Sequence, residues 1–162
     1  MKRIDLTHWV LGSLALGLGL MVYLTDRDPS HAVLIPAVAS LRGHHAFGAV
    51  GDWLPSFVHP LAFSLFTAAM VPHVLRPAYW ACAVWGGLNV GFEIGQHSAV
   101  SAPLAAALRA AFGSQPPAEW LANYFVRGSF DVRDLAAAVA GAVVAALALR
   151  CMHRPLEVRY AH

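Results

Sequence analysis

Charged residues are scarce in this chain. Of its 162 residues, 12% are charged and 58% are hydrophobic, and the mean hydropathy is +0.56. A soluble globular domain carries about twice that share of charged residues, roughly 25%. The composition therefore excludes an ordinary soluble domain and indicates an integral membrane protein, built as a single domain over residues 1–162.

An excess of either charge sign is also missing. The formal net charge is only +2. The basic residues are scattered rather than gathered on one stretch, so the sequence lacks the basic patch by which proteins bind nucleic acid, and we expect no nucleic-acid partner. Arginine outnumbers lysine ten to one and alanine is abundant, a composition typical of GC-rich bacterial genomes.

Cysteine is limited to Cys82 and Cys151. Neither residue belongs to a Cys-x-x-Cys or His–Cys spacing of the kind that binds zinc. Both lie on the cytoplasmic side of the topology predicted below, where disulfides are rare, so we expect none.

Histidine is plentiful, with nine residues, but its spacing identifies no cofactor. A haem between helices needs two histidines at equal depth on facing helices, for which His59 and His97 are the only candidate pair. A cation held by His59, Glu93, Asp134 and His97 is an alternative that no fixed motif spacing supports.

Long hydrophobic runs, by contrast, are present. A helix of about 20 apolar residues crosses the roughly 30 Å of hydrocarbon in a bilayer. Four stretches meet this requirement, namely 6–24, 53–74, 78–96 and 131–150. We therefore predict an all-α integral membrane protein with four transmembrane helices, and we expect Asp52 to cap the second of them.

Shorter apolar stretches and glycines complete the predicted architecture. Residues 31–41, 103–112 and 118–126 are too short to span. The first is expected to be an interfacial or re-entrant segment, and the other two are expected to be short amphipathic helices on the membrane surface. In the first span, Gly12, Gly17 and Gly19 are expected to let another helix approach closely.

The basic residues predict the orientation of the four spans. An even number of spans places both termini on one side, which then carries six Lys and Arg residues close to helix ends, against five diluted over longer loops on the other side. The positive-inside rule therefore favours a multi-pass protein of the bacterial inner membrane with both termini in the cytoplasm.

Polar residues gather where these spans meet the outer side of the membrane. The second and fourth spans begin there and the third ends there, which brings seven polar residues to one depth: Ser56, His59, Glu93, Gln96, His97, Asp131 and Asp134. Ionisable groups at membrane depth cost several kcal/mol unless they are paired or hydrated, and they therefore suggest a functional site. We predict that the three clusters meet.

Two explanations of these residues remain open. A glutamate in an apolar wall, such as Glu93, can exchange a proton near neutral pH, with His59 as its partner. Asp131 and Asp134 stand at a helix start, where acids cap N–H groups and favour the helix dipole, so a purely structural role is the alternative for them.

Two arginines extend the possible site to a phosphate. Arg127 and Arg133 lie at the same predicted surface and could hold the headgroup of a lipid diphosphate. The neighbouring acids oppose such binding unless a cation bridges them.

The order of these residues resembles the VanZ-like family of small bacterial inner-membrane proteins. The resemblance rests on His59, the run Glu93-Ile-Gly-Gln96, the run Phe130-Asp131-x-x-Asp134-Leu135 and Gly141, and it covers roughly residues 52–144. The founding member of that family is associated with resistance to the glycopeptide teicoplanin. The resemblance implies a membrane bundle that handles an envelope lipid or glycan precursor, or that confers glycopeptide tolerance.

The chain departs from the family pattern at three places. Ala138 stands where the family has asparagine, Gly128 stands where it has arginine with Arg127 one residue away, and the connection from Gln96 to Phe130 is longer than usual. The lost asparagine puts shared chemistry in doubt.

Two functional hypotheses follow, and the sequence leaves enzymatic activity undecided between them. In the first, a membrane lipid is the partner, Glu93 is the acid–base residue, and His59 and Asp134 complete the catalytic group. The substrate-binding residues would then be Gln96, His97, Asp131, Arg127 and Arg133. In the second, the chain is a non-catalytic accessory subunit that binds other subunits of a larger membrane complex, which the missing asparagine and the long connection favour.

Overall fold

The computed structural model describes residues 6–26, 46–71, 75–113 and 115–159. Over these residues the chain is all-helical, which confirms the predicted class. Its helices are α1 (Leu6–Thr25), α2 (Ala49–Met70), α3 (Leu75–Gly95), α4 (Ser98–Phe112), α5 (Pro116–Arg127) and α6 (Val132–Arg159). The predicted interfacial segment 31–41 lies outside the described residues.

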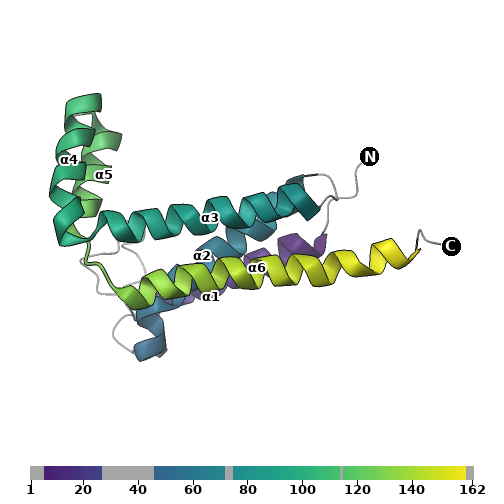
Figure 1. Cartoon of the computed structure of the whole chain (residues 1–162). Helices are drawn as coiled ribbons and strands as arrows, with labels where there is room; N and C mark the ends of the chain where they lie inside the picture. Colours follow the sequence, from purple (N-terminus) through teal and green to yellow (C-terminus); the bar gives the residue numbers. More distant parts are fainter. Residues whose placement is uncertain (1–5, 27–45, 72–74, 114, 160–162) are drawn as a thin grey trace.

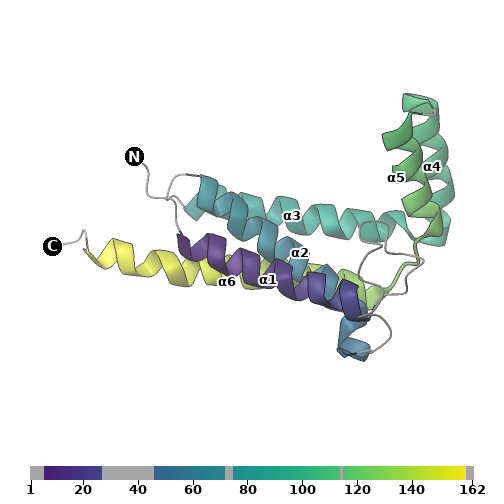
Figure 2. The same ribbon diagram turned by 180° about the vertical axis from the view of Figure 1, so that it is seen from behind.

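Four of the helices form an antiparallel bundle, and the other two form a hairpin at one end of it. Figures 1 and 2 show α1, α2, α3 and α6 running side by side, with α4 and α5 standing out across their direction. Helix α2 packs against α1, α3 and α6, and α3 also packs against α6. The start of α1 and the end of α6 therefore lie at the end of the bundle away from the hairpin.

Three helices are long and apolar enough to cross a membrane, namely α1, α2 and the stretch Val132–Met152 of α6. The prediction of four such spans is wrong, because α3 has the length, 21 residues, but not the hydropathy. The sequence of α3 includes Asn89, Glu93 and four glycines, which lower its mean hydropathy.

The start of α2 differs from the prediction. The helix begins at Ala49, after Gly48, whose φ of +52° lies in the left-handed region that favours glycine. Asp52 therefore lies in the first turn rather than at the cap. The backbone N–H of Phe47 donates to Asp26 Oδ2 at 2.9 Å, which joins the end of α1 to the approach to α2.

The bundle is apolar both inside and outside. One buried cluster joins α2, α3 and α6, and a second joins α1 and α2. Their members are Leu65, Ala68, Ala78, Cys82, Ala145 and Leu149 in the first, and Val22, Leu54 and Val58 in the second. Large apolar side chains such as Leu14, Val84 and Leu147 are exposed on the outer surface. Apolar side chains on both faces of a helix are typical of a bundle in lipid.

Glycines set the closest helix contacts. A Cβ atom at Gly19 would lie 2.6 Å from Val58 Cγ2, and one at Gly12 would lie 2.7 Å from the Phe66 ring. The predicted close approach is confirmed for these two glycines but wrong for Gly17, which has nothing within 4 Å. Helices α6 and α2 meet in the same way at Gly141.

We expect Gly141→Ala to destabilise the bundle. A Cβ at Gly141 would collide with the carbonyl oxygen of Phe57 and lie 3.1 Å from Pro60 Cγ, and such overpacking costs about 1–3 kcal/mol. The matched control is Gly87→Ala in α3, where nothing lies within 4 Å, so the better helix propensity of alanine should leave stability equal or slightly raised. Thermal unfolding in detergent measures both changes, and equal midpoints for the two variants would contradict the close approach.

The hairpin is held together by an ion pair. Arg109 of α4 donates from Nε to Glu119 Oε2 at 2.8 Å and from a terminal nitrogen to Oε1 at 3.0 Å, and Asn123 Nδ2 also donates to Oε1 at 3.1 Å. The predicted segments 103–112 and 118–126 are both helical. Helix α4 begins earlier than predicted because His97 Nδ1 accepts the N–H of Ala99 and caps it.

The ion pair predicts a pH dependence of the hairpin. The hydrogen bond from Arg109 holds the pKa of Glu119 below its ordinary value of 4.5. A lowered folded pKa means that the stabilisation is complete above the unfolded pKa and is lost as the pH falls through the folded pKa. Because both side chains are exposed, the effect should be small. NMR titration of the Glu119 carboxyl carbon should give a midpoint below 4.5, which Arg109→Gln raises. A wild-type midpoint at or above 4.5 would refute the pairing in solution.

Candidate functional site

Polar residues of three helices meet at the hairpin end of the bundle. Glu93 Oε1, near the end of α3, accepts the backbone N–H of Asp131 at 2.7 Å. Ser56 Oγ of α2 donates to Asp134 Oδ1 in the first turn of α6 at 3.0 Å. The contacts bring the three predicted clusters together.

Asp131 caps α6. It directly precedes the helix, its Oδ1 accepts the N–H of Arg133 at 2.8 Å, and its Oδ2 lies 3.3 Å from Arg133 Nε. An acid at this position satisfies an N–H group that has no partner within the helix and favours the helix dipole. Asp131 therefore makes the capping contacts that the structural interpretation predicts for an acid at this position.

The cap is completed by a different helix. In a capping box the side chain of the third helical residue bonds back to the N–H of the cap residue. Here Asp134 holds that third position but accepts from Ser56. The N–H of Asp131 instead reaches Glu93, which is only 9% exposed. The start of α6 is thus tied to α3 and to α2 at once.

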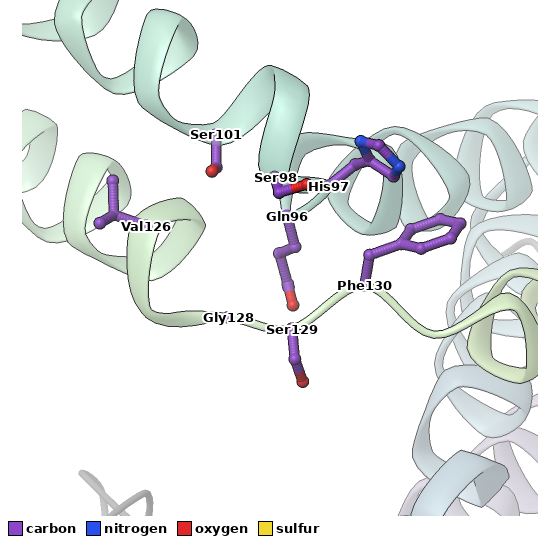
Figure 3. A pocket seen from close by; sticks show the side chains of 8 residues that line it. All are labelled: Gln96, His97, Ser98, Ser101, Val126, Gly128, Ser129 and Phe130. Atoms are coloured by element: carbon purple, nitrogen blue, oxygen red, sulfur yellow. The ribbon is translucent and has the colours of Figure 1, made fainter.

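A pocket of about 350 Å³ lies beside this cap, between the end of α3, the start of α4 and the linker from α5 to α6. Its lining residues are Gln96, His97, Ser98, Ser101, Val126, Gly128, Ser129 and Phe130. Figure 3 shows the Gln96 side chain pointing toward the linker at Ser129 and the His97 ring on the side of Phe130. The His97 and Phe130 ring centroids are 5.1 Å apart.

Glycine lets the linker approach Gln96. A Cβ atom at Gly128 would collide with the Gln96 side chain. The linker can therefore lie directly on the amide, which forms one wall of the pocket.

The predicted site residues divide between the cap and the pocket. Gln96 and His97 line the pocket, whereas Glu93, Asp131 and Asp134 form the cap.

The other three predicted residues lie around them. His59 is half-buried on α2, one turn from Ser56, with its ring 6.2 Å from that of Phe63. Arg127 is exposed at the end of α5, and Arg133 is exposed and paired with Asp131.

Sequence reasoning missed most of the pocket wall. Ser98, Ser101 and Ser129 were not predicted, although serines in a first helical turn and after a helix-ending glycine are a visible polar signal in so apolar a chain. A hydroxyl carries no charge and costs less than an acid at membrane depth, so a serine indicates a functional site less strongly than an acid does.

The lining favours hydrogen bonding to a polar group. It offers a glutamine amide, three hydroxyls and an imidazole, and it contains no acid. Within the described ranges, no three His, Cys, Asp or Glu side chains are grouped so that they could hold a metal ion. The lining therefore suits hydrogen bonding to a polar group.

We expect Glu93→Ala to loosen the start of α6. The N–H of Asp131 would lose its acceptor at a partly buried position, and leaving a buried donor unsatisfied costs about 1–3 kcal/mol. Glu93→Gln is the matched control, because its amide oxygen can still accept this N–H. Hydrogen exchange at the Asp131 amide should be faster in the alanine variant only. Equal protection in both variants and the wild type would show that Glu93 does not hold the cap.

No protein-family model, no curated protein and no solved structure matches this chain.

Proposed function

We propose that the protein binds the polar headgroup of a membrane lipid in the pocket beside the α6 cap. The observation that carries this proposal is the pocket itself, about 350 Å³ and lined mainly by hydrogen-bonding side chains at one end of an apolar bundle. Its volume is in the range of small-molecule sites, roughly 300–1,000 Å³. An envelope lipid or a lipid-linked glycan precursor is the ligand class that the VanZ-like resemblance implies, with glycopeptide tolerance as its physiological consequence.

The charges near the pocket support an anionic headgroup. Asp131, which would oppose a phosphate, is paired with Arg133 and directed at the N–H groups of α6. Arg127 is exposed and directly precedes the pocket residue Gly128. Arginine is well suited to phosphate through its several N–H donors.

The proposed setting is the bacterial inner membrane, with the pocket toward the periplasm and both termini in the cytoplasm. Helices α1, α2 and α6 cross the bilayer, and α3 packs beside them. The outer face of α3 supports its place in lipid, because Trp80, Val84 and Leu88 follow one another at four-residue spacing and are all exposed.

An acid–base role for Glu93, with His59 and Asp134 as its partners, belongs to this proposal as a separate step. The side chain of Glu93 already holds the cap of α6, so a loss of activity in a Glu93 variant could reflect loss of the cap. Glu93→Gln separates the two roles, since it keeps an acceptor oxygen and removes the exchangeable carboxyl proton.

The test is to fill the pocket and measure bound lipid. Native mass spectrometry of the detergent-purified protein, offered an isoprenoid phosphate or phosphatidylglycerol, should show a bound lipid that Ser101→Leu loses at least tenfold. Ala107→Leu is the control, because Ala107 is exposed on the same helix and does not line the pocket. Equal lipid binding by both variants would exclude the pocket as the site.

The second candidate is a non-catalytic accessory subunit of a larger membrane complex. It is favoured by the observation that the three acids of the polar end are engaged in bonds within the chain. Under this proposal the protein purifies in mild detergent with other membrane subunits at fixed stoichiometry, and Glu93→Gln changes neither that stoichiometry nor the lipid content.

A further inference from the structure

The α4–α5 hairpin is set across the direction of the bundle. Figures 1 and 2 both show it standing out from the end of α3, with α5 on the side toward the length of the bundle and α4 on the outer side. Three helices of the bundle are long and apolar enough to cross a bilayer. If they do so, a hairpin at this angle runs along the bilayer surface, with α5 on the side toward the lipid.

An aromatic row lines the inner angle between α3 and α5. Phe92 of α3 meets Tyr124 of α5 edge to face, with ring centroids 5.6 Å apart, and Trp120 stacks on Tyr124 at 6.0 Å. Phe125 stacks on Phe92 at 5.5 Å from the buried side of α5. The ring contacts therefore run without a break from α3 to α5.

Three of these four rings are exposed, and only Phe125 is buried. Trp120 is 61% exposed, Tyr124 40% and Phe92 38%. Phe92 continues the exposed stripe of α3 that includes Leu88 and Val84. Exposed aliphatic side chains therefore lie along α3, and exposed Trp and Tyr rings lie along α5. Aliphatic side chains suit the acyl region of a bilayer, whereas Trp and Tyr rings suit the headgroup region.

The hairpin carries too few unpaired charges to be attached by anionic lipid headgroups. Arg109 and Glu119 neutralise each other, so among the described residues 98–127 the one charged side chain outside this pair is Arg127. Strong attachment to anionic lipid needs several cations. The hairpin therefore depends on burial of its rings and not on attraction to anionic headgroups.

We propose that the α4–α5 hairpin is a membrane-interface anchor, with Trp120 and Tyr124 in the headgroup layer and lipid chains along the exposed face of α3. It holds the linker that follows α5, and with it the pocket, at headgroup depth. The inference does not depend on what the pocket binds.

The test measures depth at single positions in the full-length protein. Nitroxide labels are placed by Trp120→Cys and by Tyr124→Cys in a Cys151→Ser background, in which Cys82 is buried and protected from labelling. Ala107→Cys is the matched control, since Ala107 is exposed and lies on the face of α4 opposite buried Ala105. The protein is reconstituted in phosphatidylcholine vesicles, and collision with oxygen and with a water-soluble nickel chelate is measured by EPR.

The expected result is a several-fold preference for oxygen over nickel at positions 120 and 124 and the reverse preference at position 107. Preference for nickel at all three positions would overturn the proposal, because the hairpin would stand in water. Protection of position 120 from both reagents would also overturn it, because a second copy or another protein would then cover the rings.

A measurement with the native rings guards against perturbation by the labels. Phosphatidylcholine brominated near the headgroup should quench tryptophan emission less in Trp120→Phe than in the wild-type protein, with unchanged helical content by circular dichroism. Equal quenching in the two proteins would count against the anchor.

Discussion

The hydrogen bond from the N–H of Asp131 to Glu93 Oε1, 2.7 Å long, organises the end of the bundle that carries the hairpin. The first N–H groups of a helix have no partner within it, and here a carboxylate from a neighbouring helix supplies one. The bond joins residues 38 positions apart and holds the point at which the chain re-enters the bundle. The Ser56–Asp134 bond adds α2 to the same junction.

The hairpin and the pocket follow from this closure. The chain leaves the bundle after Gly95, builds α4 and α5, and returns at Asp131. Gln96 lies where the chain leaves the bundle, and the linker of residues 128–130 lies where the chain returns to it. The pocket is formed where these two segments meet. The connection between Gln96 and Phe130 is longer than in the VanZ-like pattern, and this same segment supplies most of the pocket wall. The proposed binding site is therefore formed by the part of the chain that differs from that pattern.

Several features could be predicted because they depend on neighbours in the chain. Apolar runs indicated the helices within about five residues of their bounds, except that α6 ends at Arg159, nine residues beyond the predicted end at 150. The isolated acids indicated a polar end. The prediction that 78–96 spans the membrane failed because the glycines and polar residues of α3 lower its hydropathy, although α3 packs in the bundle like the other helices. The capping role assigned to Asp52 failed because the helix begins earlier, after the left-handed Gly48.

The amino-acid sequence by itself determined an all-helical chain with helices long and apolar enough to cross a membrane, with acids at a helix start and glycines where helices approach closely. Hydropathy, capping preference and side-chain size are local properties, and a single chain displays them directly. Only the tertiary structure decided that Glu93 caps α6, that Asp134 bonds Ser56 and that serines line a pocket beneath a hairpin set across the bundle. Each of these depends on which helix faces which, and residue spacing does not encode the distance between groups on different helices.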